Sequence, residues 1–120
     1  MSTQEVASRL VEMCRQGQNM EALSELYAEH CVSREMPGMP NVLTEGLTAI
    51  KAKSENWYAT VEEFHGGEVS DPVVAGNYFT CKMSFDITVK GQGRSQNEEL
   101  CIYEVTDGKI TSEQFFYSMD

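Results

Sequence analysis

Two glutamates near the end of the chain have the residue type and spacing for acid–base chemistry. Glu99 and Glu113 lie on either side of Asp107-Gly108, a dipeptide that favours a β-hairpin turn. A three-residue turn at 106–108 would put both carboxylates on one face of the hairpin, whereas a two-residue turn would put them on opposite faces. We prefer the three-residue turn because it gathers both carboxylates on an otherwise apolar face. A carboxylate buried there has a raised pKa, which suits a general acid or base.

A histidine is the third candidate for this chemistry. His65 lies on the first long predicted strand, from which it could reach the same face of the sheet. An imidazole beside a carboxylate is oriented by it and exchanges a proton near neutral pH. The alternative for His65, Glu99 and Glu113 is a structural role as hydrogen-bonded core residues.

Large side chains surround these candidates in the predicted sheet. They either line an apolar pocket or fill a core, because aromatic stripes occur in both. Tyr27 is the best polar candidate among them, since a buried phenol needs a hydrogen-bond partner. The predicted ligand-binding residues are Tyr27, Trp57, Met83, Phe85, Tyr103, Phe115 and Tyr117.

Three helices are predicted before the long strands. The first begins at the Ser2–Glu5 capping box and ends at Gly17, and the second begins at Asn19 and fades near His30. The third begins after Thr44. Its predicted buried stripe is Leu47, Ile50, Ser54, Trp57, Tyr58 and Val61, and its predicted solvated side chains are Lys51, Lys53 and Glu55.

Strand patterns occupy 31–36, 62–70, 73–75, 78–90 and the two arms of the hairpin. A turn at 91–93 would place Phe85 opposite Glu99, and the three-residue hairpin turn would place Cys101 opposite Glu113 and Glu99 opposite Phe115. The order of elements predicts an α+β fold, in which three N-terminal helices pack on one face of a curved antiparallel β-sheet that forms a cone.

Length and charge restrict the class of protein. The chain has 120 residues, which predicts a single domain over 1–120, and its net charge is −10, with 19 acidic and 9 basic residues. An acidic surface argues against nucleic acid and against anionic membranes as partners. The start of the chain does not have the pattern of a signal peptide. The four cysteines have no metal-ligand spacing, so we expect buried thiols in a reducing cytoplasm, and neither a metal nor a cofactor.

Three segments carry a resemblance to a known family: LYAEHCVSRE at 26–35, GLTAIKAKSENW at 46–57 and ELCIYEVTDGKITSEQFFY at 99–117. With them the chain resembles, over nearly its whole length, the SnoaL-like branch of the nuclear transport factor 2-like superfamily. The resemblance implies a cystatin-like cone with a pocket and, often, a homodimer formed through the sheet. It also makes Glu35 a candidate, because a carboxylate near this place often faces the cone in the family; the alternative is a solvated edge residue.

The superfamily includes ketosteroid isomerases, polyketide cyclases, epoxide hydrolases, dehydratases and binding or assembly domains. The Asp-Arg-Asp constellation of the epoxide hydrolases is not evident here, because Asp86 is predicted to face away from Glu99. The chain is therefore expected to bind a small apolar molecule and to transfer protons on it as a cofactor-independent isomerase, cyclase or dehydratase. The alternative is a non-catalytic ligand-binding or dimerisation module. The catalytic candidates are His65, Glu99, Glu113 and Glu35.

The other face of the predicted hairpin is also apolar. It carries Leu100, Ile102, Ile110 and Phe116, and an exposed patch of this kind marks an interaction surface. We therefore expect a homodimer whose two sheets pack face to face.

Overall fold

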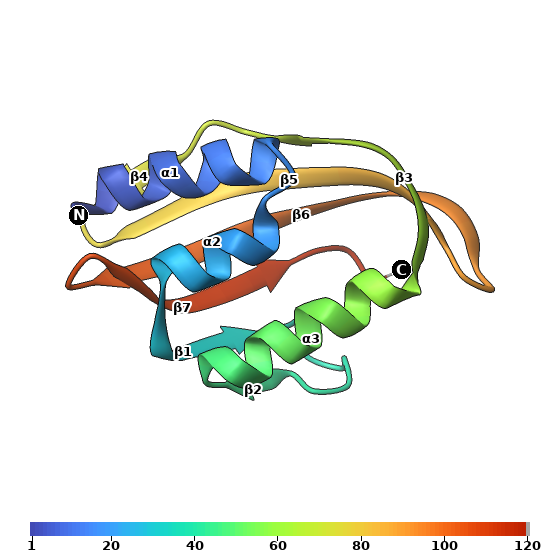
Figure 1. Ribbon diagram of the computed structural model, residues 1–120, viewed down its shortest axis with the longest axis horizontal. Helices are drawn as coiled ribbons and strands as arrows, with labels where there is room; N and C mark the ends of the chain where they lie inside the picture. The colour runs from blue at the N-terminus through green and yellow to red at the C-terminus, as the bar shows by residue number, and fades with distance from the viewer. Residues whose placement is uncertain (120) are drawn as a thin grey trace.

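The computed structural model describes residues 1–119, and Figure 1 shows their arrangement. The chain alternates between helices and strands in its first half and then continues as long strands. The elements are α1 (Thr3–Arg15), α2 (Asn19–Leu26), β1 (Tyr27–Arg34), β2 (Leu43–Glu45), α3 (Leu47–Thr60), β3 (Val61–Val69), β4 (Val73–Ala75), β5 (Tyr78–Val89), β6 (Gly93–Thr106) and β7 (Lys109–Phe116).

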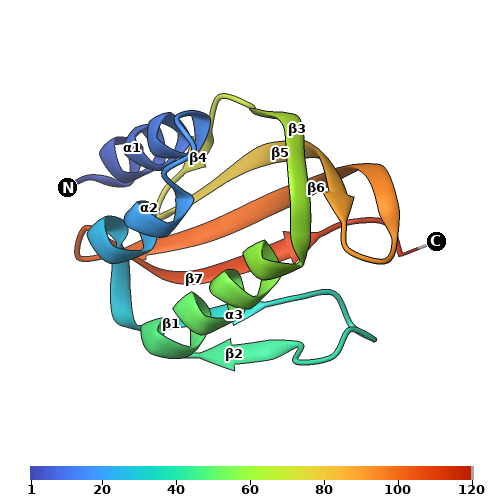
Figure 2. The same ribbon diagram turned by 45° about the vertical axis from the view of Figure 1, so that its right-hand side comes forward.

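The strands form one curved sheet that does not close on itself, in the order β2-β1-β7-β6-β5-β3, with β4 paired to β5 (Figure 2). Its neighbours are antiparallel except for β1 and β7, which run parallel. The α+β class is confirmed, but the prediction of a wholly antiparallel sheet is wrong. Strands joined by short turns must run antiparallel, whereas β1 and β7 are joined through most of the chain, so no turn fixes their relative direction.

The first helix has the predicted start. The backbone N–H of Glu5 donates to Ser2 Oγ at 3.1 Å, and the Ser2 N–H donates to Glu5 Oε1 at 2.9 Å, which is the capping box. Gly17 follows the helix with a φ of +75°, as a residue that ends a helix in the left-handed region does.

The boundary after the second helix differs from the prediction. The helix ends at Leu26 and β1 begins at Tyr27, although a helix to His30 and a strand at 31–36 were predicted. Tyr27 pairs with Ile110 of β7, so sheet pairing takes over where the apolar spacing still fits a helix. The short strand β2 was missed; it contains Thr44, the predicted helix cap, and pairs with β1.

The third helix follows its predicted buried stripe only in its first half. Ile50 is fully buried, but Trp57 and Tyr58 are exposed at 39% and 41%. Lys53, which was predicted to be solvated, points inward and reaches Ser33 of β1 at 2.9 Å. The helix contacts β1, β2 and β3, so its middle faces the interior while its last turns extend beyond the core.

The hairpin between β6 and β7 closes with a two-residue turn. Asp107 and Gly108 have φ angles of +52° and +76°, and Thr106 pairs with Lys109, so the predicted three-residue turn is wrong. A bulge then leaves Thr111 without an opposite residue, because Val105 pairs with Ile110 and Glu104 with Ser112. The extra residue restores the predicted faces.

The pairs along the hairpin are therefore shifted, although the faces are as predicted. Cys101 lies opposite Phe115, and Tyr103 lies opposite Glu113, instead of Cys101 opposite Glu113. Both glutamates still share one face. The bulge does move Ile110, which was predicted on the outer face and is fully buried.

The pairing of β5 with β6 is shifted by two residues. The turn lies at 90–92, so Met83 rather than Phe85 lies opposite Glu99, and Cys81 lies opposite Cys101. A shift by an even number keeps every side chain on its predicted face.

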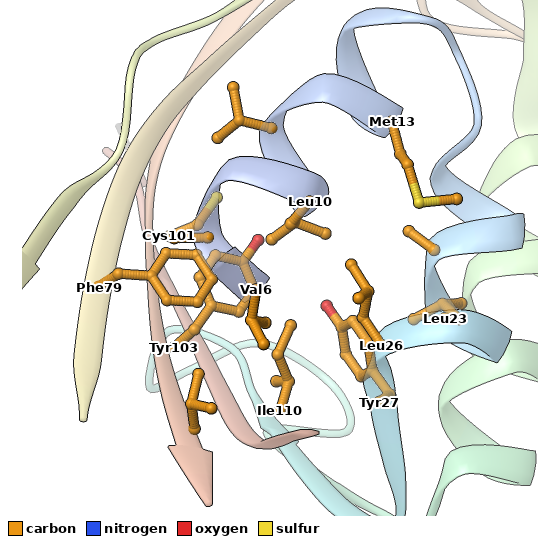
Figure 3. Packing of buried hydrophobic residues seen from close by; sticks show 14 of the residues in the cluster. Val6, Leu10, Met13, Leu23, Leu26, Tyr27, Phe79, Cys101, Tyr103 and Ile110 are labelled. Carbon is orange, nitrogen blue, oxygen red and sulfur yellow. The ribbon is translucent and has the colours of Figure 1, made fainter. Parts of the chain in front are cut away.

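The core joins the face of the sheet that carries Glu99 and Glu113 to all three helices. Figure 3 shows its labelled side chains from α1, α2 and the strands. Val6 of α1, Leu23 of α2 and Ile50 of α3 belong to one buried cluster. Phe79 and Tyr103 stack within it, with ring centroids 4.7 Å apart. In residues 1–119, none of the helices is long and apolar enough to cross a membrane.

Candidate functional site

A buried carboxylate lies at the centre of the site. Glu113 of β7 is only 4% exposed, and its two oxygens accept hydrogen bonds from the hydroxyls of Tyr27 and Ser33, the latter at 2.7 Å. Both donors come from β1, which runs parallel to β7 and pairs Ser33 with Glu113. Burial raises the pKa of Glu113, and the two hydrogen bonds oppose this shift because they favour the ionised form.

A lysine extends this network from α3. Lys53 Nζ donates to Ser33 Oγ at 2.9 Å and to Glu35 Oε1 at 3.3 Å, and it lies 5.7 Å from the centre of the Phe115 ring. The side chains of Lys53 and Glu35 are 27% and 21% exposed, so this ion pair is largely shielded from solvent.

Tyr117 closes the network at its outer end. Its hydroxyl donates to Glu35 Oε2 at 2.9 Å. Burial, followed by the hydrogen bond to Glu35, raises the pKa of Tyr117 to about 12. A continuous chain of hydrogen bonds thus runs from Tyr27 in the core through Glu113, Ser33, Lys53 and Glu35 to Tyr117. Its members lie on β1, α3 and β7, except for Glu35 and Tyr117, which directly follow β1 and β7.

Glu99 of β6 lies beside this network with fewer donors. Burial, and next the negative charge of Glu35, raise the pKa of Glu99 to about 7. A weak hydrogen bond from Cys101 Sγ to Glu99 Oε1, at 3.6 Å, opposes the shift, as does the positive charge of Lys53. Two hydroxyls hold Glu113, whereas a thiol is the donor to Glu99, so Glu99 is the carboxyl group better suited to exchange its proton near neutral pH.

His65 does not join the carboxylates. Its Nε2 lies 2.7 Å from Thr88 Oγ1, and its Nδ1 lies 2.9 Å from Glu63 Oε2. The pairing of β3 with β5 is irregular between Phe64 and Gly66, and both partners of His65 lie on these two strands. The expected contact of His65 with Glu99 and Glu113 is therefore absent from the described structure.

Asp86 faces away from Glu99, as the strand alternation predicted. Arg94 donates to both oxygens of Asp86, at 3.0 and 2.9 Å. This ion pair, rather than a partner in the site, holds the pKa of Asp86 below its usual range.

The predicted ligand-binding residues divide into two groups. Five of them lie at the network or beside it: Tyr27, Phe115 and Tyr117 through the contacts above, Met83 opposite Glu99, and Tyr103 opposite Glu113. Two lie elsewhere: Trp57 and Phe85 contact each other with ring centroids 5.5 Å apart.

Sequence reasoning missed three members of the site: Ser33, Lys53 and Cys101. A signal existed for the first two. Ser33 and Glu35 are two residues apart on an extended segment, which puts them on one side, and Lys53 lies three residues after the buried Ile50, which puts it on the same side of the helix.

The described residues contain no cluster of three or more His, Cys, Asp or Glu side chains placed to hold a metal ion. Two surface hollows lie away from the network. One, of about 440 Å³, is bordered by α1 and Pro72, and the other, of about 510 Å³, lies over the outer face of β3, β5 and β6. The network itself offers carboxyl, ammonium and hydroxyl groups.

The family model of the SnoaL-like domain matches residues 1–117, and the chain belongs to this family. A solved structure from Mesorhizobium loti, named as a candidate SnoaL-like polyketide cyclase, is 36% identical; the match covers 98% of this chain and 100% of that chain, with a TM-score of 0.92.

More distant structures share the fold alone. A protein with a ketosteroid isomerase-like fold from Catenulispora acidiphila, in complex with trimethylamine, is 20% identical, with 96% of this chain and 86% of that chain covered and a TM-score of 0.75. A protein with a cystatin-like fold from Xanthomonas campestris is 15% identical, with 98% and 92% covered and a TM-score of 0.81. No protein of curated function matches the chain.

Proposed function

We propose that this protein binds a small, largely apolar molecule beside Glu99 and catalyses a proton transfer on it. The observation that carries the proposal is the placement of Glu99, a partly buried carboxyl group opposite Met83 that accepts a hydrogen bond from the Cys101 thiol; burial and the charge of Glu35 raise its pKa to about 7. A carboxyl group with this pKa is present in both protonation states near neutral pH, so it can take a proton from one atom of a ligand and return it to another.

The rest of the network supports Glu99 by position and charge. Glu113 is locked by Tyr27 and Ser33, so its proposed role is to hold Ser33 and, through it, the Lys53 ammonium. That ammonium would stabilise negative charge that develops on a ligand oxygen when Glu99 removes a proton. Isomerisation, cyclisation and dehydration all contain such a step, and the Mesorhizobium loti relative is named for cyclase chemistry.

The ligand would lie against the apolar side chains that surround Glu99. Met83 lies opposite Glu99 on β5, and Phe115 lies opposite Cys101 on β7, so both flank the carboxyl group on the same face. Tyr117 adds a half-buried ring and a hydroxyl at the outer end. These three residues are the proposed wall of the cone.

A screen of small molecules followed by a hydrogen-exchange assay tests this function without knowledge of the product. Neutral carbonyl compounds that bind in ligand-observed NMR would be incubated with the protein in heavy water, and deuterium incorporation at carbon would be followed by mass. We expect wild-type protein and Glu98→Gln to catalyse exchange, and Glu99→Gln to bind the same compounds without exchange. Glu98 is a matched control because it is the neighbouring glutamate and is paired with Lys82 at 3.1 Å on the other face.

Binding without exchange by the wild-type protein would instead support the non-catalytic ligand-binding module. Exchange that persists in Glu99→Gln would move the acid–base role to another group. Each result thus separates the two functions that the sequence left open.

We also propose that the functional unit is a homodimer formed through the outer face of the sheet. Leu100 and Phe116 are directly paired across β6 and β7, next to Ile102, and these three are 52%, 37% and 39% exposed. A contiguous apolar patch on central strands suits a second copy of the same patch, because a two-fold interface is self-complementary. The patch is smaller than predicted, since Ile110 lies in the core.

A further inference from the structure

Two cysteines face each other on neighbouring central strands. Cys81 of β5 is directly opposite Cys101 of β6. Residues directly opposite in an antiparallel pair have Cα atoms about 4.5–5.5 Å apart. A disulfide needs Cα atoms about 4.4–6.8 Å apart, so the backbone could accept this bond without rearrangement.

The two thiols interact unequally. The neighbouring Cys101 thiol, and next the positive charge of Arg15, lower the pKa of Cys81 despite its burial. The pKa of Cys101 is raised by the neighbouring Cys81 thiol and by burial. Because the thiolate is the form that reacts with oxidants, Cys81 would react first and Cys101 would complete the disulfide.

The pair is connected to the site. The Cys101 thiol donates a hydrogen bond to Glu99 Oε1 at 3.6 Å. Cys81 and Cys101 are 3% and 0% exposed, so the oxidant of this pair would have to be small and uncharged, such as hydrogen peroxide.

We propose that Cys81 and Cys101 are a peroxide-responsive thiol pair whose oxidation to a cross-strand disulfide withdraws the thiol donor from Glu99. The Cys81 thiolate attacks one oxygen of hydrogen peroxide. The O–O bond breaks, hydroxide leaves, and Cys81 becomes a sulfenic acid. The Cys101 sulfur then attacks the Cys81 sulfur, and water leaves as the disulfide forms. In total, two thiols are oxidised, one peroxide is reduced, and two waters are released.

The disulfide would change the carboxyl group beside it. Without the Cys101 hydrogen, Glu99 loses its nearest donor, and its protonated form is favoured further. If Glu99 is the base of the proposed function, on which this consequence rests, oxidation would reduce the fraction of active protein at neutral pH. The formation of the disulfide itself does not depend on that function.

A variant that keeps only this pair tests the proposal. Cys14→Ser with Cys31→Ser retains Cys81 and Cys101, and the same protein with Cys81→Ser is the control. After treatment with hydrogen peroxide, we expect the first protein to lose two hydrogen atoms in its intact mass and to give a Cys81–Cys101 cross-linked peptide that a reductant removes. The control should gain oxygen or remain reduced.

The proposal would be overturned if peroxide oxidised the thiols of the unfolded protein but left those of the folded protein reduced. Formation of a sulfinic acid without a disulfide would overturn it as well. If the double variant does not fold, differential alkylation of wild-type protein before and after peroxide identifies the paired cysteines directly. An NMR titration of Glu99 in both redox states tests whether the disulfide acts on the site. A Glu99 pKa that rises on oxidation supports this connection, and an unchanged pKa refutes it. Both outcomes are independent of whether the protein is an enzyme.

Discussion

Removal of the Tyr27 hydroxyl tests how the network holds Glu113. Tyr27 is 7% exposed and donates to Glu113, which is 4% exposed, so no water replaces the lost donor without entering the core. The change Tyr27→Phe therefore leaves one carboxylate oxygen of Glu113 with a hydrogen bond fewer. The ring and its packing are kept, so the cost measures the hydrogen bond rather than a cavity.

The cost depends on the charge of Glu113. A hydrogen bond to a charged group contributes about 1.5–3 kcal/mol, whereas one between neutral groups contributes about 0.5–1.5 kcal/mol. The bond from Tyr27 lowers the pKa of Glu113, so its loss raises that pKa further above the value in the unfolded chain. A carboxyl group with a folded pKa above its unfolded pKa destabilises the fold as pH rises from the unfolded value towards the folded one.

The difference in unfolding free energy between wild type and Tyr27→Phe should therefore grow with pH. We expect about 1 kcal/mol at a pH where Glu113 is protonated in both proteins, and about 2–3 kcal/mol at a pH where it is ionised in both. Urea denaturation followed by circular dichroism at several pH values measures it. Tyr78→Phe is the control, because Tyr78 donates to Glu104 at 3.0 Å on an exposed surface, and its removal should give no such pH dependence. A Tyr27→Phe effect that is constant or falls with pH would refute the reasoning.

Three further changes have expected outcomes. Glu99→Gln should stabilise the protein at pH 8 by up to roughly 2–3 kcal/mol, because the neutral side chain avoids the free-energy cost of ionising a carboxyl group whose pKa is raised from 4.5 to about 7. It should have little effect at pH 4, and urea denaturation at the two pH values measures the difference. Lys53→Met should raise the pKa of Glu99 in an NMR titration, because it removes a positive charge that lowers it, whereas Lys51→Met on the same helix should not. Ile102→Lys, at a residue 39% exposed on the outer face, should convert a dimer into monomers in light scattering at micromolar protein; a monomeric wild type would contradict the proposed interface.

The shared face of the two glutamates was predicted correctly from a register that differs from the one observed, because the bulge at Thr111 offsets the two-residue turn. The predicted hairpin turn and the predicted β5–β6 turn were both wrong, yet each error left the pairing shifted by an even number of residues. Ile110 shows where alternation fails: it lies between the turn and the bulge at Thr111, and a bulge leaves no regular trace in the apolar pattern.

The long-range partners of the site could not be predicted in the same way. Ser33 reaches Glu113 through the parallel pairing of β1 with β7, which brings together residues 80 positions apart. Lys53 reaches Ser33 of β1 because it lies on the same side of the third helix as the buried Ile50. Local sequence patterns predict whether a segment is a helix or a strand, whereas its orientation is fixed by packing against elements distant in the sequence.

The polar candidates were predicted with mixed success for a physical reason. A carboxylate on an apolar face is costly unless its surroundings compensate it, so Glu113 could be recognised as a residue that needs partners. The position of His65 carries no such constraint, since its strand pairs irregularly with β5 and its partners Glu63 and Thr88 lie on the same two strands. The functional roles of the four catalytic candidates stay predictions.

The pKa of Glu99 is the most direct test of the proposed acid–base function. Protein with ¹³C-labelled glutamate would be titrated by NMR, and the Glu99 carboxyl signal would be assigned by its loss in Glu99→Gln. The structure predicts a pKa of about 7, because burial and Glu35 together outweigh the Cys101 hydrogen bond and the Lys53 charge. A measured value near the ordinary glutamate pKa of about 4.3 would contradict the account, because Glu99 would then be ionised throughout the neutral range like any surface carboxylate.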